Sequence, residues 1–219
     1  MRTRVKICGI TRPGDGIAAV EAGADAIGLV FWRGTPRCVE LEQARSIAAA
    51  LPAFVNIVGL FVDPAPELVH SVLAAVPLDT LQFHGDEPPA LCASFGRGYV
   101  KAVPVRPGVD LLQYSARYPE ALGLLFDAFQ PGGMPGGTGT TFDWTRLPQQ
   151  LTDSMPRRLI LSGGLTPQNV AAAVRAVRPW AVDVSSGVEE TDAEGAPRRG
   201  IKSAARIAAF IREVRHADG

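Results

Sequence analysis

The sequence lacks an excess of charge of either sign. Its 219 residues include 22 Lys and Arg against 22 Asp and Glu, so the formal net charge is zero. A protein that binds nucleic acid in general normally shows a basic excess or a basic patch. We therefore expect no nucleic-acid partner.

Long hydrophobic runs and cysteines are also scarce. No run of about 18 apolar residues occurs, so we expect no membrane-spanning helix. Residues 1–4 lead directly into a strand pattern instead of the apolar core of a signal peptide. Cys8, Cys38 and Cys92 are too few and too scattered for a disulfide framework or a zinc site. We expect a cytoplasmic protein with reduced thiols and no bound metal.

What the sequence does contain is a regular alternation of apolar strand patterns and helical patterns. The expected strands are 4–8, 25–31, 55–62, 80–83, 99–103, 122–126, 158–162 and 181–185. The expected helices are 13–23, 40–51, 65–76, 88–96, 109–117, a short one from Asp143, 167–177 and 201–214. Asp63-Pro64 and Thr166-Pro167 are expected to begin helices, with proline in the first turn. A glycine-rich loop is expected at 128–141.

These patterns favour an α/β fold in a single domain that covers residues 1–219. Continuously apolar strands are typical of a parallel sheet that is buried on both faces. Eight strand–helix units in 219 residues suit a closed (β/α)₈ barrel at the small end of its size range. An open, doubly wound sheet is the alternative, because periodicity alone does not show closure.

Polar and glycine residues gather where the expected strands end. In a (β/α)₈ barrel these ends converge at one mouth, which holds the active site. Residues far apart in the sequence would then share one pocket. The strand-end residues are Cys8, His84, Asp127, Gly163, Gly164, Ser185, Ser186 and Gly187.

Cys8 and Asp127 are the candidate catalytic pair. Most free cysteines are small buried hydrophobic residues, but a thiol at a strand end could act as a base if it ionises. Asp127 could be a helix cap or an ion-pair partner. No helix follows it directly, however, and a carboxyl group among apolar side chains is more readily protonated and can act as an acid.

The remaining candidates would bind substrate. Glycine turns beside a helix N-terminus can bind phosphate through backbone amides, which fits the turns after the last two strands, although glycine pairs also occur simply in tight turns. Arg37 could be a solvated charge or could grip a carboxylate with two hydrogen bonds. His84 could be an ordinary core histidine, and Asp183 could simply accept from turn amides. Cys38 and Cys92 are assigned no chemistry.

Several segments together resemble one enzyme family, phosphoribosylanthranilate isomerase of tryptophan biosynthesis. The first segment is 5–11 (VKICGIT). The others, in the same order as in the family, are 23–28 (GADAIG), 81–85 (LQFHG), 137–139 (GTG) with 142–144 (FDW), 161–165 (LSGGL) and 182–189 (VDVSSGVE). Thr35 stands where the family pattern leads us to expect serine.

The resemblance implies a TIM barrel of the ribulose-phosphate-binding type and an Amadori rearrangement without a cofactor. The substrate would be N-(5-phosphoribosyl)anthranilate. By resemblance, Cys8 would be the general base and Asp127 the general acid. Arg37 would hold the anthranilate carboxylate, and the turns at 163–164 and 186–187 would hold the phosphate. His84, Asp183 and Ser185 are the other expected substrate contacts.

Two other functions compete with this one. A synthase that acts on indole glycerol phosphate would need a catalytic lysine and glutamate at strand ends, and only Lys6 and Lys101 lie in the expected strands. A catalytically dead barrel would bind a phosphorylated ligand without turnover, but the presence of both Cys8 and Asp127 argues against it. We expect a monomer, with a dimer as the alternative.

Overall fold

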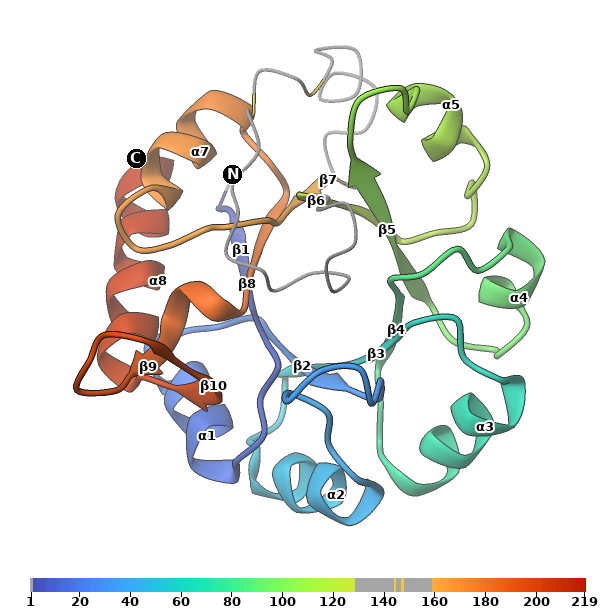
Figure 1. Cartoon of the computed structure of the whole chain (residues 1–219), viewed down its shortest axis with the longest axis horizontal. Helices are drawn as coiled ribbons and strands as arrows, with labels where there is room; N and C mark the ends of the chain where they lie inside the picture. The colour runs from blue at the N-terminus through green and yellow to red at the C-terminus, as the bar shows by residue number, and fades with distance from the viewer. Residues whose placement is uncertain (1, 129–143, 145–146, 148–158) are drawn as a thin grey trace.

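Eight parallel strands form one closed barrel, and the helices surround it (Figure 1). The computed structural model describes residues 2–128, 144, 147 and 159–219, so the loop expected at 128–141, apart from Ala128, and most of the short helix expected from Asp143 lie outside the described residues. The barrel strands are β1 Arg4–Cys8, β2 Ala26–Val30, β3 Asn56–Phe61, β4 Thr80–Phe83, β5 Tyr99–Val105, β6 Gly123–Ala128, β7 Leu159–Leu161 and β8 Ala181–Val184. The helices are α1 Pro13–Ala22, α2 Leu41–Ala50, α3 Pro66–Ala75, α4 Pro89–Ala93, α5 Leu111–Ala116, α7 Val170–Val177 and α8 Ala204–Asp218.

The barrel closes where its last strand pairs with its first. β8 lies parallel to β1, with Val182 beside Val5 and Val184 beside Ile7. The prediction of a (β/α)₈ barrel is therefore confirmed, and the open doubly wound sheet is excluded. Closure places the carboxyl ends of all eight strands around one mouth.

Successive side chains of each strand point alternately toward the helices and into the barrel. Ile7, Ile27 and Val103 are fully buried in the core between strands and helices. The inward positions are more polar than the apolar strand pattern indicated, and they include Lys6, Gln82 and Asp183, all of them buried. The interior of the barrel is thus where charge is buried.

The sequence signals at the ends of α1 explain why this helix matches its prediction. Pro13 lies in its first turn, where no backbone donor is needed. Gly23 ends it in the left-handed region at φ 102°, and the Gly23 amide donates to the carbonyl groups of Ala19 and Val20. A Cβ on Gly23 would meet only the end of the Arg215 side chain, which can move aside, so the left-handed backbone is the reason that glycine is favoured there.

Two predicted helix starts are wrong. Asp63 does not cap α3, which begins at Pro66; Asp63 has a left-handed backbone at φ 43°, and its carboxylate accepts from the Asp86 amide at 2.7 Å. Likewise α7 begins at Val170, and Thr166 lies in the preceding turn, where its amide donates to Asn169 Oδ1 at 2.8 Å. In both places the polar side chain or backbone bonds within a loop instead of capping the helix.

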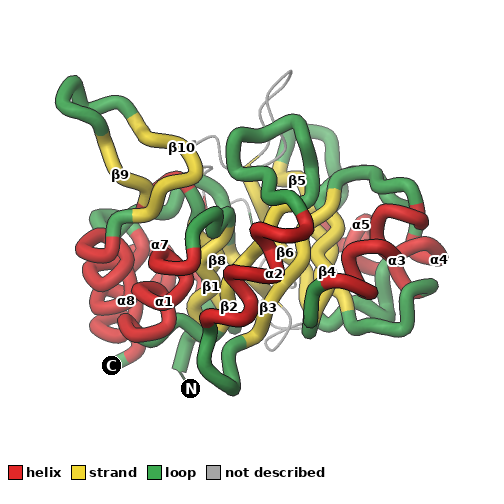
Figure 2. The backbone as a smooth tube through the Cα atoms, turned by 90° about the horizontal axis from the view of Figure 1, so that it is seen from below, coloured by secondary structure: helices red, strands yellow, loops and turns green. Residues whose placement is uncertain are grey.

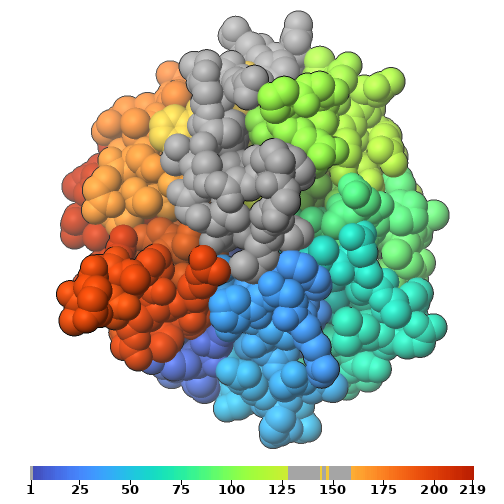
Figure 3. Space-filling model, viewed as in Figure 1, coloured from blue at the N-terminus to red at the C-terminus, as the bar shows by residue number. Residues whose placement is uncertain are grey.

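The predicted start of the last helix, at 201, is also wrong. A short 3₁₀ helix, η2 (Ser186–Val188), leads into the antiparallel pair β9 (Glu189–Thr191) and β10 (Pro197–Lys202), which projects from the barrel end (Figure 2). Lys202 is held in the hairpin because its amide donates to Asp15 Oδ2 at 3.0 Å, and α8 begins only after Ser203. The hairpin adjoins the segments that follow β1 and β2 (Figure 3), and Thr11 Oγ1 donates to the Gly200 carbonyl at 2.5 Å.

Candidate active site

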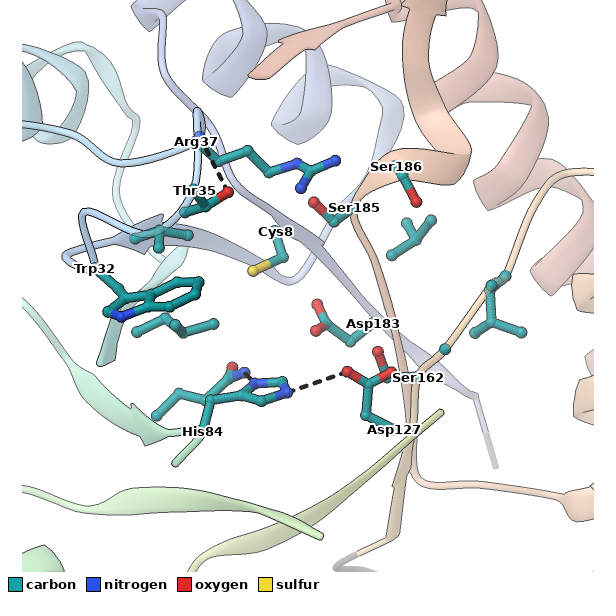
Figure 4. A pocket seen from close by; sticks show the side chains of 17 residues that line it. Cys8, Trp32, Thr35, Arg37, His84, Asp127, Ser162, Asp183, Ser185 and Ser186 are labelled. Atoms are coloured by element: carbon teal, nitrogen blue, oxygen red, sulfur yellow. Dashed lines mark hydrogen bonds and ion pairs between the residues drawn. The ribbon is translucent and has the colours of Figure 1, made fainter. Parts of the chain in front are cut away.

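A pocket opens at the carboxyl ends of the barrel strands and brings most of the predicted site residues together (Figure 4). Its wall includes an apolar part, formed by Val30, Trp32 and Leu60. The predicted site residues that line it are Cys8, Arg37, His84, Asp127, Gly163, Gly164, Asp183, Ser185 and Ser186. Residues from β1 through to the segment after β8 therefore share one cavity.

Cys8 is the last residue of β1, and its side chain faces the pocket. It lies beside Gly28 of β2 and is only 5% exposed. Burial raises the pKa of the Cys8 thiol; Lys6 and Lys202 lower it, Asp183 raises it, and the net direction is upward. The thiol is thus harder to ionise than a free cysteine, and the two lysines act against that effect.

Asp127 faces the same pocket from β6 and contacts His84. His84 Nε2 lies 3.1 Å from Asp127 Oδ2, and its other ring nitrogen, Nδ1, lies 3.1 Å from Gln82 Nε2. The Gln82 amide nitrogen can only donate, so Nδ1 accepts and Nε2 carries the hydrogen that is donated to Asp127. The expectation of a carboxyl group among apolar side chains is therefore wrong: a polar chain from Gln82 through His84 orients Asp127.

Arg37 lies at the pocket wall, but its guanidinium already holds a carboxylate of this chain. Nε and Nη2 donate to Glu189 Oε1 and Oε2 at 2.7 and 2.9 Å. Arg37 is 4% exposed, so it is not the solvated charge that one reading of the sequence suggested. Lys202 Nζ and the Gly200 amide also donate to Glu189 Oε1, at 3.1 and 2.9 Å.

Glu189 is the centre of this buried cluster, and although it ends the segment 182–189 that resembles the family, no role was predicted for it. Burial acts to raise its pKa, but the hydrogen bonds from Arg37 and the charge of Lys202 outweigh burial, so the pKa of Glu189 is lowered. For Lys202 the balance is the opposite. The effect of burial is larger than the attraction of Glu189, so the pKa of the Lys202 ammonium group is lowered. The cluster fixes the position of Arg37 at the pocket.

The loop after β7 lines the pocket with backbone. Gly163 and Gly164 have left-handed φ values of 87° and 60°, which few other residues adopt without strain. Asn169 Nδ2 donates to the Gly164 carbonyl at 3.0 Å and holds the turn in place. Ser185 and Ser186, after β8, complete this side of the pocket.

Gly187 does not line the pocket, unlike its neighbours Ser185 and Ser186. A Cβ at this position would overlap the Leu165 carbonyl oxygen. Gly187 therefore permits the loops after β7 and β8 to pack closely, a role that the strand-end pattern did not distinguish from phosphate binding.

Asp183 does not bond to turn amides, as one interpretation of the sequence held. Its Oδ1 accepts from Lys6 Nζ at 2.9 Å inside the barrel. The structure also adds Gln82, Trp32 and Ser162 to the pocket wall, and none of these was predicted. Gln82 and Ser162 sit at strand ends beside residues that were predicted, which is the signal that could have found them.

Two further observations concern the described part of the chain. No group of three or more His, Cys, Asp or Glu residues there is arranged to hold a metal ion. No described helix has the length and apolar character needed to cross a membrane.

Comparison with known proteins identifies the family. The family described as N-(5'-phosphoribosyl)anthranilate (PRA) isomerase matches residues 5–213. The chain belongs to the phosphoribosylanthranilate isomerase family. One family member, the N-(5'-phosphoribosyl)anthranilate isomerase of Thiobacillus denitrificans, is 56% identical over 215 residues, which are 98% of this chain and 99% of the relative.

Solved structures of this isomerase family share the fold. The phosphoribosyl anthranilate isomerase of Thermotoga maritima is 39% identical with a TM-score of 0.84, and the match covers 98% of this chain and 99% of that one. Another solved member, in complex with reduced 1-(o-carboxyphenylamino)-1-deoxyribulose 5-phosphate, is 38% identical with a TM-score of 0.80 and the same coverage. The family resemblance seen in the sequence is therefore confirmed over nearly the whole chain.

Proposed function

We propose that this chain is the phosphoribosylanthranilate isomerase of tryptophan biosynthesis, with Cys8 as general base and Asp127 as general acid. The activity follows from membership of the family, with relatives of that name matched along the whole chain. The observation that carries the residue assignment is that a thiol from β1 and a carboxyl group from β6 open into one pocket.

The first chemical step needs a proton. The substrate is an aldosylamine, and opening of its furanose ring requires a proton on the ring oxygen as the bond from C1 to that oxygen breaks. Asp127 delivers this proton and becomes a carboxylate, while the amine nitrogen donates its electron pair to form a Schiff base. The His84 Nε2 hydrogen bond then stabilises the carboxylate.

The second step removes a proton. The Schiff base acidifies the hydrogen on C2, and the Cys8 thiolate takes it, which leaves an enolamine. The enolamine tautomerises to the ketone, the 1-(2-carboxyphenylamino)-1-deoxyribulose 5-phosphate product. Electrons are redistributed only within the substrate, so no external oxidant or reductant takes part.

The rest of the pocket suits the two ends of this substrate. Trp32, Val30 and Leu60 offer an apolar wall for the anthranilate ring. Arg37 also lines the pocket, but because two of its nitrogens already donate to Glu189, only its remaining N–H groups can bind the anthranilate carboxylate. Backbone amides of 163–164 and Ser186 suit the phosphate at the opposite side. The product analogue bound in a solved relative is a phosphorylated molecule of this kind, which supports the substrate class.

The two rival functions have less support. A synthase with a lysine and glutamate pair would need these groups in the pocket, but the Lys101–Glu87 and Lys202–Glu189 pairs have fully buried side chains and do not line it. A dead barrel would not need a thiol and an oriented carboxyl group facing one cavity.

Rescue of a tryptophan-requiring strain that lacks this isomerase tests the function. The wild-type gene is expected to restore growth without tryptophan, and the purified chain is expected to convert the substrate. A chain that binds a product analogue but neither restores growth nor converts substrate would instead be the dead barrel. Formation of indole glycerol phosphate by the purified chain, without conversion of N-(5-phosphoribosyl)anthranilate, would favour the synthase.

The assembly and location of the enzyme are also proposals. All the groups named for the reaction come from one chain, so a monomer is sufficient, and a dimer is the alternative. Sedimentation equilibrium of the full chain distinguishes the two. Cys8 must remain a free thiol to act, which fits the reducing cytoplasm.

A further inference from the structure

We propose that Lys6 is a positioning residue whose ammonium group, held by Asp183, lies beneath Cys8 and favours its thiolate form. The inference rests on the proposed function only in that Cys8 is the base. It adds a residue from inside the barrel to the catalytic pair and gives Asp183 a role other than substrate binding.

The strand register brings the three groups together. Lys6 and Cys8 are two residues apart on β1, so both side chains point into the barrel. Lys6 is the cross-strand neighbour of Asp183 on β8, and Lys6 Nζ donates to Asp183 Oδ1 at 2.9 Å. Both side chains are at least nine-tenths buried.

Gly28 shows how close the sulfur and the ammonium group are. It is the neighbour of Cys8 on β2, and a Cβ there would lie 2.8 Å from Cys8 Sγ and 3.1 Å from Lys6 Nζ. The sulfur and the nitrogen are therefore within about 6 Å of each other, a range in which opposite charges favour ionisation. Glycine at this position leaves the space that both groups need.

Lys6 is placed to act on Cys8 and not on the substrate. It does not line the pocket that contains Cys8 and Asp127. It borders a separate space at the amino-terminal end of the barrel, on the far side of Cys8. Any effect of Lys6 on the reaction must then pass through Cys8 or Asp183.

The charges that face Cys8 come from three elements. Lys6 on β1 and Lys202 on β10 favour the thiolate, and Asp183 on β8 opposes it. From β2 and β3, Cys8 packs against apolar Val30 and Leu60. Burial lowers the pKa of Lys6, but the attraction of Asp183 and of the Cys8 thiolate outweighs it and the net pKa is raised, so Lys6 keeps its charge while Cys8 titrates.

Alkylation of Cys8 by iodoacetamide tests the proposal without using the reaction. Only the thiolate reacts, so the rate as a function of pH reports the pKa of Cys8 whether or not Cys8 is the base. The full chain carries Cys38→Ser and Cys92→Ala, which leave Cys8 as its one thiol. Lys6→Met is expected to raise the pKa of Cys8 by about 1–3 units, and to slow alkylation near neutral pH by about tenfold per unit.

Further variants make the test specific. Lys6→Met with Asp183→Asn removes both charges and is expected to raise the pKa of Cys8 less than Lys6→Met alone. Lys101→Met removes another fully buried, paired lysine on β5, and is expected to leave the titration of Cys8 unchanged. If Lys6→Met does not fold, Asp183→Asn decides, since it is expected to lower the pKa of Cys8.

A folded Lys6→Met protein whose Cys8 titrates as in the wild type would overturn the proposal. So would an equal shift in Lys101→Met, because the effect would then be a general result of losing a buried ion pair. The pH at which kcat/KM rises with increasing pH is expected to shift together with the midpoint of the alkylation titration. Failure of Cys8→Ala to reduce turnover would instead refute the role of Cys8, and leave the alkylation result standing.

Discussion

His84 Nε2 lies 3.1 Å from Asp127 Oδ2, and Gln82 Nε2 donates to the opposite ring nitrogen of His84, Nδ1. A hydrogen bond to a charged group contributes about 1.5–3 kcal/mol. Replacement of His84 by Gln, which cannot keep the same geometry, is therefore expected to lower kcat about ten- to hundredfold. Steady-state kinetics measures this, and an unchanged kcat would show that His84 does not orient the acid.

Asp127→Asn removes the acidic proton and keeps the shape of the side chain. The amide oxygen can still accept from His84 Nε2, so the fold is expected to survive with nearly the same melting temperature. The rate is expected to fall by about 10²–10⁴, the usual contribution of a general acid. A collapse of the melting temperature would mark Asp127 as a structural residue instead.

Gly187→Ala tests whether this glycine serves packing. Its Cβ would overlap the Leu165 carbonyl oxygen, and backbone cannot yield as a side chain can. We expect the free energy of unfolding in urea to fall by about 1–3 kcal/mol. Gly14→Ala, in α1 with no atom within 4 Å of the new Cβ, is the matched control and is expected to be neutral or stabilising. Equal stability of the two variants would refute the packing role.

Glu189 makes stability depend on pH. Its pKa is lowered because Arg37 and Lys202 outweigh the cost of burial. A carboxyl group whose pKa is lower in the folded than in the unfolded protein stabilises the fold at pH values above its unfolded pKa of about 4.3. That stabilisation is lost as the pH falls through its pKa in the folded protein. The free energy of unfolding in urea is thus expected to be higher for the wild type than for Glu189→Gln by about 3–5 kcal/mol near neutral pH. This difference is expected to shrink as the pH falls below about 4.

Glu190→Gln is the control for that measurement. Glu190 pairs with Arg198 at 2.8 Å, but both side chains are exposed, at 36% and 51%. An exposed pair contributes about 0–1 kcal/mol, so this variant is expected to match the wild type at every pH. Equal behaviour of Glu189→Gln and Glu190→Gln would contradict the importance of the buried cluster.

The sequence predicted the barrel because its strands are apolar and regularly spaced. Closure could not be predicted from local patterns, because it depends on the pairing of Val5 with Val182 from the opposite end of the chain. The β9–β10 hairpin was missed because its residues are mostly polar and exposed. The helical pattern includes Lys202, but in the structure the Lys202 amide donates to Asp15 and keeps this residue in β10.

The sequence predicted those residues of the candidate site that lie at the ends of the barrel strands. Cys8 and Asp127 were found this way, because each interrupts an apolar run at the point where the strand ends. Lys6 and Asp183 are 177 positions apart, and Arg37 and Glu189 are 152 apart. No local pattern pairs such residues, so the partners that orient the site became visible only in three dimensions.

Single-turnover conversion of N-(5-phosphoribosyl)anthranilate by wild type and Cys8→Ala, with enzyme in excess, tests the central claim most directly. Both proteins are expected to bind a product analogue with similar affinity, because Cys8 contributes a proton acceptor and little binding surface. Cys8→Ala is expected to convert the substrate at least about 100-fold more slowly. Conversion at the wild-type rate by the folded variant would contradict the account.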